Sequence, residues 1–343
     1  MGSTTGDDDT VPTWAPGSVR FRVLGPVVAM GAVGEPLSLG PPRRRTLLAA
    51  LLVHANSPLS VDQLTDMLWD GSPPPTAMTM VHGAVAGLRQ AFGRGCGGNG
   101  PPLLVTRDGG YVLDVPPWHV DVRRFEQLLA RGRRMSSAAP EPASRLLAEA
   151  LALWRGPALS GIELHFARDA ATRWEELRLE CLGAQIEAEL ALGHHADVVA
   201  GLADLVARNP FRERLCAQLM VALYRCGRQA EALDASRTLR RTLTSELGVE
   251  PGPEMQRLER SILRHCGDLA VPVAPSARTS LLRSTRLSVG SANERRSPPC
   301  SGPTALSRSP ARAARARPDS RLRSPGNAPR GGRTTHGWST SRR

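Results

Sequence analysis

The hydrophobic pattern of the first 40 residues predicts short strands. Apolar side chains occupy every second position from residue 19 to 23, which places them on one face of a strand. Gly25 and Pro26 end this run, and the short apolar stretches 27–30 and 37–39 are separated by further Gly and Pro residues. The chain is therefore expected to open with a small antiparallel sheet.

Three segments with helical periodicity follow, at 43–55, 60–69 and 76–92. Ser60 and Gln63 match a capping box, in which each of the two side chains accepts a hydrogen bond from the backbone amide of the other residue. The pattern therefore predicts three helices joined by short turns.

The third helical segment has two different faces. Its predicted buried stripe consists of Ala77, Val81, Ala84, Val85, Leu88 and Phe92. Thr79, His82, Ala86 and Arg89 lie on the opposite side. This second face is expected to be free to contact a partner.

A hairpin is predicted after the third helix. The apolar runs 103–106 and 111–115 flank Asp108-Gly109-Gly110, and glycine accepts the positive φ of a tight turn. A small sheet, three helices and a two-stranded wing form a winged helix of the response-regulator output type. This fold is expected over residues 18–116.

Residues 121–266 are almost entirely amphipathic helix and predict a second, all-α domain. A period of 34 residues relates Gly193 to Gly227, Ala196 to Ala230, Asp197 to Glu231, Val199 to Leu233 and Leu205 to Leu239. This period is the length of a tetratricopeptide-type helix–turn–helix repeat, although chance helical periodicity could produce part of the match. The predicted fold class is mainly α with a small β component.

Most of the net charge belongs to one segment. The chain of 343 residues carries a formal charge of +12, but residues 271–343 hold 15 Arg against 2 acidic residues, a net of +13. This Arg-, Ser- and Pro-rich tail has almost no periodic apolar positions, so it is expected to be disordered, either as a functional tail or as DNA read out of its ancestral frame. The acidic leader 1–17 is also expected to be disordered.

The composition excludes several chemistries. All 44 basic residues are Arg, so neither a Schiff-base lysine nor a phosphate-loop lysine exists. The six cysteines include no Cys-x-x-Cys pair, and no enzymatic, metal or cofactor motif is recognised. The longest apolar run, 47–53, is far shorter than the ~20 residues of a membrane span, and no secretory signal precedes it. The sequence predicts a cytoplasmic protein that is not an enzyme and has no cofactor.

Several motifs, taken together and in order, resemble one family. They are Arg22-Val23-Leu24-Gly25-Pro26, Leu51-Leu52-Val53-His54-Ala55-Asn56, Val105-Thr106-Arg107 with Gly110-Tyr111, Leu153-Trp154-Arg155-Gly156-Pro157-Ala158-Leu159, Leu219-Met220 with Ala222-Leu223-Tyr224-Arg225, Gly227-Arg228-Gln229-Ala230-Glu231-Ala232-Leu233, and Glu246-Leu247-Gly248 with Glu250-Pro251-Gly252-Pro253. Over residues 18–266 the chain resembles the Streptomyces antibiotic regulatory protein family of transcriptional activators.

This resemblance implies a DNA-binding domain at 18–116 and a bacterial transcriptional activation domain at 121–266. Members of the family bind direct repeats of double-stranded DNA upstream of biosynthetic gene clusters and recruit RNA polymerase. Direct repeats imply head-to-tail copies or a homodimer. No phosphate loop follows the second domain, so the chain resembles the small form of the family.

The third helix is expected to be the recognition helix. Thr79, His82 and Arg89 are the candidates for reading base edges, and Arg107 beside the hairpin turn is the candidate for a minor-groove contact. Arg43, Arg44 and Arg45 begin the first helix and are candidates for phosphate contacts. The alternative for all of these residues is a solvated charged face.

The turn after the second helix resembles the loop that contacts RNA polymerase in this class of winged helix. It contains Trp69, Asp70 and three prolines, Pro73, Pro74 and Pro75, which stiffen it. The alternative is a rigid connector.

Two positions depart from the family pattern. The family resemblance implies a residue such as arginine where this chain has Met78. The family resemblance implies an arginine where this chain has Gly87, so Gly87→Arg is expected to tighten DNA binding. Gly87, Ala86 and the near-neutral first domain also support a second hypothesis, a helical-repeat interaction scaffold whose winged helix has lost DNA reading.

Overall fold

The structure, a computed structural model, describes residues 19–95 and 103–265. The predicted leader 1–17 and the predicted tail 271–343 lie outside the described residues, as do Cys96, Cys266 and Cys300. All described residues belong to one compact unit of the chain.

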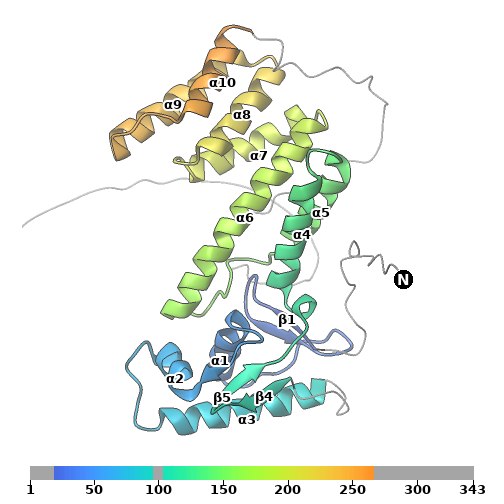
Figure 1. Ribbon diagram of the computed structural model, residues 1–343, viewed down its shortest axis with the longest axis vertical. Coiled ribbons are helices and arrows are strands. Elements are labelled where there is room, and N and C mark those ends of the chain that lie inside the picture. Colours follow the sequence, from blue (N-terminus) through green and yellow to red (C-terminus); the bar gives the residue numbers. More distant parts are fainter. Residues whose placement is uncertain (1–18, 96–102, 266–343) are drawn as a thin grey trace, which may run out of the picture. The chain divides into compact units, whose positions relative to one another are not determined.

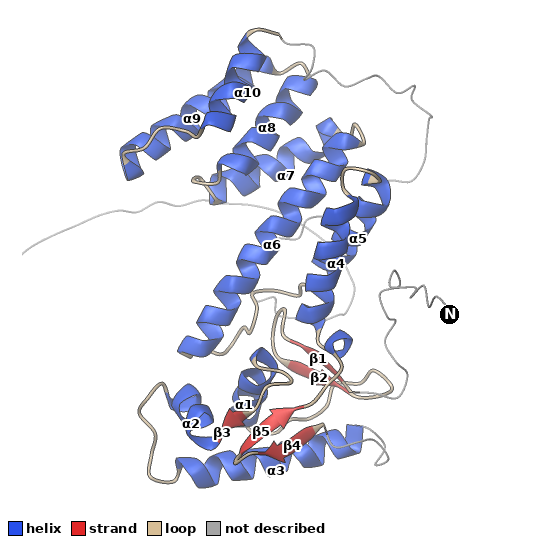
Figure 2. Cartoon of the chain, in the orientation of Figure 1, coloured by secondary structure: helices blue, strands red, loops and turns tan. Residues whose placement is uncertain are grey.

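The amino-terminal part has the predicted order of small sheet, three helices and hairpin, with one predicted strand absent and one strand added (Figures 1 and 2). The elements are β1 (Arg20–Arg22), β2 (Val28–Met30), α1 (Pro42–Val53), β3 (Leu59–Ser60), α2 (Val61–Trp69), α3 (Ala77–Gly95), β4 (Leu104–Arg107) and β5 (Gly110–Leu113). Figure 1 shows α3 beside the β4–β5 hairpin, the arrangement of a winged helix.

The first sheet contains two strands. β1 pairs antiparallel with β2, and Phe21 lies opposite Ala29. The expectation of a third strand at 37–39 is wrong, because only an isolated bridge joins Met30 to Pro36. Proline has no amide to donate to a ladder, and Gly40, with a φ of +79°, turns the chain toward α1.

The second sheet has the strand order β3-β5-β4 and includes a strand that the hydrophobic pattern missed. β3 is only two residues long, too short to show an alternation, and its Leu59 pairs with Tyr111 of β5. A Cβ at Gly110 would lie 2.2 Å from the carbonyl oxygen of Leu59, so the close pairing of β3 and β5 requires a glycine at this position. The predicted tight turn is confirmed by the positive φ of Asp108 and Gly109.

The capping box and the buried stripe are also confirmed. The Ser60 hydroxyl accepts a hydrogen bond from the Gln63 amide at 3.1 Å, and the Gln63 side chain accepts one from the Ser60 amide at 2.9 Å. All six residues of the predicted stripe of α3 are buried.

The remaining described residues are helical. A short 3-10 turn, η1 (Pro117–His119), leads to α4 (Asp121–Met135), α5 (Pro140–Ala152), α6 (His165–Ala191), α7 (His195–Arg208), α8 (Glu213–Arg225), α9 (Gln229–Leu247) and α10 (Pro253–Leu263). α7 and α9 start at residues 34 apart, and Gly193 and Gly227 precede them with positive φ. The 34-residue period therefore corresponds to one pair of helices. None of the helices in the described part of the chain has the length and apolar character needed to cross a membrane.

Asp121, the first residue of α4, joins the helical part to the first strand. One of its carboxylate oxygens accepts a hydrogen bond from the Val23 amide at 2.8 Å, and the other accepts one from the Leu24 amide at 3.2 Å. The guanidinium of Arg155 lies 3.5 Å from the same carboxylate. The amides of Arg155 and Leu159 donate to the carbonyls of Leu24 and Val23 in return. The motifs around residues 22–26 and 153–159 thus pair with each other through the backbone.

The apolar core is continuous across residues 116–121, where the winged helix ends and the helical part begins. One cluster of buried residues runs from β1 to α6 and includes Phe21, Leu88, Phe125 and Trp174. A second cluster extends from Leu190 to Ile262. The predicted boundary at 116–121 is therefore a change of secondary structure across which the core is continuous.

Burial raises the pKa of Asp121 from 3.8 to about 6, against the opposing effects of the Val23 and Leu24 amides and of Arg155. Between these two pH values the folded chain holds a proton that the unfolded chain has released. The stabilising contribution of this proton is complete below about pH 4 and is lost as the pH rises to about 6. Asp121→Asn is neutral throughout this range, so the stability of the wild-type protein relative to this variant is expected to fall by about 2 to 3 kcal/mol between pH 4 and pH 7.

Urea unfolding of the two proteins at each pH measures this difference, since the other carboxyl groups cancel. Asp204→Asn, at an exposed position of α7, is the control for the removal of one carboxyl group. A difference that stays constant across the range would contradict the raised pKa.

Candidate nucleic-acid interface

The outward face of α3 is exposed and carries few large side chains. Thr79, His82, Gly83 and Ala86 are all exposed. The His82 ring meets the Tyr111 ring of β5 edge to face, with the centroids 6.3 Å apart. Small side chains let the helix backbone approach a partner closely, and a DNA major groove about 12 Å wide admits one helix. The predicted recognition face is therefore accessible.

Arg89 also lies on this side of α3, but the wing holds its side chain. Its Nε donates to the Leu104 carbonyl at 2.9 Å, and one terminal nitrogen donates to the Thr106 hydroxyl at 2.8 Å. Its guanidinium also lies 5.6 Å from the centroid of the Tyr111 ring. Arg89 thus joins the helix to the wing, and a base contact would require at least one of these bonds to open. Its base-reading role stays a prediction.

Arg107 lies at the end of β4, beside the hairpin turn. It forms an ion pair with Asp114 at 3.5 Å, and both side chains are more than half exposed. Exposed pairs of this kind contribute little, typically 0 to ~1 kcal/mol, so a DNA phosphate can readily replace Asp114.

The first turn of α1 concentrates positive charge. Its N-cap residue is Pro41, which provides no side-chain cap, and the turn contains no acidic residue. Arg43, Arg44 and Arg45 therefore stand at the helix end where the peptide dipoles already place partial positive charge. An anion bound at this end would relieve the repulsion, which favours the predicted phosphate contacts over a merely solvated face.

The three arginines do not have the same surroundings. The Arg43 guanidinium lies 5.0 Å from the Trp69 ring centroid and 3.5 Å from the Met80 sulfur of α3. The Arg44 guanidinium lies on Gly87 of α3. Arg45 is exposed.

The expectation for Gly87→Arg needs open space at position 87, and Arg44 already occupies that space. Gly87 is buried, and a Cβ there would lie 2.2 Å from Cζ of Arg44. An arginine at this position would have to displace Arg44. The substitution is therefore expected to disturb an existing cation rather than add one.

The loop between α2 and α3 is divided into two parts by its contacts. Trp69 is half-buried beneath Arg43, and Asp70, with a φ of +47°, turns toward α6. The Asp70 carboxylate accepts a hydrogen bond from the His165 amide at 3.2 Å, and its other oxygen lies 3.1 Å from the His165 ring nitrogen. Pro73 and Pro75 are exposed. In the predicted polymerase-contact loop, Trp69 and Asp70 thus contact other elements of the protein, whereas Pro73 and Pro75 are exposed to solvent.

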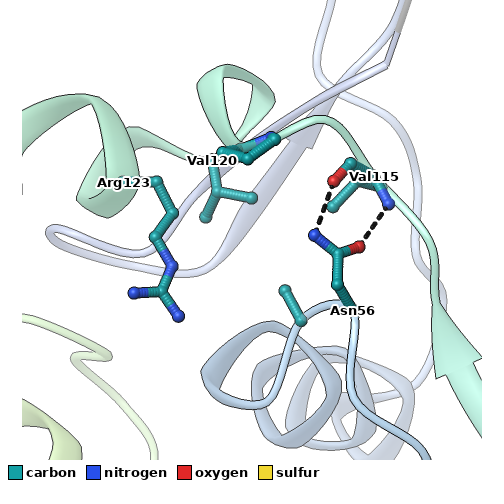
Figure 3. A pocket seen from close by; sticks show the side chains of 6 residues that line it. Asn56, Val115, Val120 and Arg123 are labelled. Atoms are coloured by element: carbon teal, nitrogen blue, oxygen red, sulfur yellow. Dashed lines mark hydrogen bonds between the residues drawn. The ribbon is translucent and has the colours of Figure 1, made fainter. Parts of the chain in front are cut away.

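A cavity of about 320 Å³ lies where α1, β5 and the start of α4 meet (Figure 3). Asn56, with a φ of +65°, accepts a hydrogen bond from the Val115 amide and donates one to the Val115 carbonyl, both at 2.9 Å. Arg123 on its rim pairs with Glu126 at 2.9 Å. The polar side chains that line the cavity already have partners, so their arrangement serves to join the elements.

Sequence reasoning missed four residues that shape this surface, namely Met80, Thr106, Tyr111 and His165. Their contacts join different elements, and periodicity within one element does not show which neighbour a side chain meets. The family motif contains Thr106 and Tyr111 but gives no partner for them, and no sequence signal marks His165.

The comparisons with known proteins agree with this architecture. Residues 120–263 match the family model of the bacterial transcriptional activator domain. The chain is 38% identical over 255 residues to the regulatory protein DnrI of Streptomyces peucetius, and the match covers 72% of this chain and 92% of DnrI. The chain belongs to the Streptomyces antibiotic regulatory protein family.

Members of this family are transcriptional regulators and not enzymes. The chain is also 39% identical over 266 residues to the regulatory protein AfsR of Streptomyces coelicolor, covering 77% of this chain and 26% of AfsR. It thus spans about a quarter of that longer family member. The solved structure of Mycobacterium tuberculosis EmbR in complex with a low affinity phosphopeptide is 36% identical, with a TM-score of 0.69, and covers 72% of this chain and 65% of that chain. The predicted fold class, a winged helix followed by a helical domain, is confirmed.

The contacts of Arg89 predict a structural effect. Arg89→Ala removes both bonds to β4 and is expected to lower the free energy of unfolding by about 1 to 2 kcal/mol, since hydrogen bonds from a charged donor contribute more than neutral ones. Arg94→Ala, at an exposed position of the same helix, should change it by less than about 0.5 kcal/mol. Urea unfolding checks both values, and equal effects of the two substitutions would show that Arg89 does not stabilise the wing.

Proposed function

We propose that this transcriptional regulator is a sequence-specific DNA-binding activator of a secondary-metabolite gene cluster. In this proposal it binds direct repeats upstream of promoters and recruits RNA polymerase. The observation that carries the proposal is the exposed face of α3 with arginines on both sides. Arg43 and Arg44 come from α1 on one side, and Arg89 and Arg107 lie on the wing side.

This arrangement suits a helix placed in the major groove. A phosphate backbone borders the groove on each side, and contacts to phosphates set the register of a protein on the duplex without reading its sequence. Thr79 and His82 then face the base edges, where a hydroxyl and an imidazole can donate or accept hydrogen bonds. The scaffold hypothesis gives no reason for arginines on both sides of an exposed helix.

The remaining parts of the proposal rest on the family. DnrI is a regulatory protein of Streptomyces, and its alignment covers nearly its whole length. Direct repeats would place two or more copies head to tail on one face of the duplex, in the cytoplasm where transcription takes place. The exposed Pro73 and Pro75 would present a stiff surface to the polymerase.

Substitutions on α3 and on the wing should have different effects on DNA binding. A target duplex is first obtained by selection from randomised sequences with the full chain, and a scrambled duplex is the reference. Thr79→Ala or His82→Ala is expected to reduce the preference for the selected duplex about 5- to 10-fold, since each good base contact contributes roughly 1 to 3 kcal/mol of discrimination.

Arg107→Ala, at the candidate minor-groove contact, is expected to weaken binding to both duplexes. It should also reduce the slope of log K against log salt by about 0.9, the loss of one cation at the DNA. Gln127→Ala, at an exposed position of α4, is the control for both experiments. If the wild-type protein selects no sequence from the random pool, the activator proposal fails and the scaffold hypothesis gains support.

The loop gives a separate prediction about transcription. The double substitution Pro73→Ala with Pro75→Ala should lower transcription from a promoter carrying the selected site several-fold, because a more flexible loop must be ordered when the polymerase binds. Affinity for the duplex should not change. Pro142→Ala, at an exposed position of α5, is the matched control, and parallel losses of affinity and transcription would argue against a polymerase contact.

A further inference from the structure

Arg44 lies in a space that two glycines leave open. A Cβ at Gly87 would be 2.2 Å from Cζ of Arg44, 2.3 Å from Nε and 2.7 Å from one terminal nitrogen. A Cβ at Gly40, at the start of the turn into α1, would be 2.9 Å from the other terminal nitrogen. The guanidinium is thus pressed against the backbone of α3, and any side chain at position 87 would occupy its place.

The Arg44 guanidinium has no hydrogen-bond or ion-pair partner among the described residues. Arg43 beside it contacts Trp69 and Met80, and Arg89 on the opposite side of α3 donates to two wing acceptors. Arg44 is half-buried, so the structure holds it in place without satisfying its donors. A guanidinium offers five N–H donors in a fixed fork that suits the oxygens of a phosphate.

The glycine itself has an energetic consequence. A glycine inside a helix is less favourable than alanine by roughly 0.5 to 1 kcal/mol. Gly93, on the same helix, has open space around its Cβ position, whereas at Gly87 an alanine would collide with Arg44. At Gly87, therefore, an alanine requires the Arg44 guanidinium to move away from α3.

Met80 and Gly87 are seven residues apart, two turns of α3, so they lie on the same side of that helix. Arg43 and Arg44 therefore follow one edge of the outward face of α3. This edge is the one that would face a phosphate backbone if α3 lies in the major groove.

We propose that Gly87 is a positioning residue that lets Arg44 of α1 reach across α3 and bind a DNA phosphate at the edge of the groove. The inference rests on the proposed function and adds to it the mechanism by which this chain delivers a cation to its recognition helix. Gly87 acts through Arg44, and any side chain at position 87 moves the cation away.

The test compares four full-length variants with the wild-type protein, namely Gly87→Ala, Arg44→Ala, the double variant, and Gly183→Ala as the control. Gly183 lies inside α6, and a Cβ there would make only ordinary contacts, 3.8 Å from Leu215 and 3.9 Å from Gln218. Affinity for the selected duplex is measured at several salt concentrations, with a constant excess of unrelated duplex so that the arginines of 271–343 contribute equally. Gly87→Ala and Arg44→Ala should each weaken binding roughly 3- to 10-fold and reduce the salt slope by about 0.9. The double variant should bind no more weakly than Arg44→Ala, and Gly183→Ala should bind like the wild type.

Urea unfolding separates this role from a structural one. Gly87→Ala should raise the unfolding midpoint in the Arg44→Ala background, where the alanine has room, and should not raise it in the wild-type background. If Gly87→Ala does not fold, Arg44→Ala still tests the phosphate contact.

Four results would overturn the inference, and they are distinguishable. Unchanged affinity and salt slope in Arg44→Ala would show that Arg44 contacts no phosphate. Additive losses in the double variant, or normal binding by Gly87→Ala beside weak binding by Arg44→Ala, would show that Gly87 does not position Arg44. A wild-type protein that binds no duplex would overturn the proposed function together with this inference.

Discussion

The buried carboxylate of Asp121 is the constraint on which the rest of the structure depends. A carboxylate removed from water is strongly unfavourable unless donors surround it. Here the backbone amides of Val23 and Leu24, which directly follow β1, and the guanidinium of Arg155 do so. Val23 and Leu24 precede α4 in the sequence, and Arg155 follows it. The start of α4 is therefore held to β1, and through β1 to the sheet and helices that carry α3.

Local features were predictable from the sequence because their causes are local. The capping box at Ser60, the turn at Asp108 and Gly109, and the buried stripe of α3 each depend on residues a few positions apart. β3 was missed because two residues show no alternation, and the strand expected at 37–39 failed because proline and glycine divert the chain after one bridge.

The candidate site was predicted as a set of residues and not as an arrangement. The outward face of α3 could be read from helical periodicity, and its exposure agrees. The glycine that Arg44 packs against and the hydrogen-bond partners of Arg89 and Asp70 lie on other elements. No spacing along the chain indicates these contacts. Gly87 is an example. In the sequence it indicates only that a side chain is missing from α3, whereas in the structure the Arg44 side chain of α1 occupies the space beside it.

The core that is continuous from β1 to α6 limits where such a protein can be divided into exchangeable modules. Elements on both sides of residue 120 share one apolar interior, so a chimera joined at that point would expose Phe21 and Phe125 to water unless the new partner supplied matching surfaces. Exchange of modules between regulators is easier farther along α6, where one cluster of buried residues gives way to the next. The change from one cluster to the next lies well inside residues 120–263, the segment that matches the family model of the bacterial transcriptional activator domain.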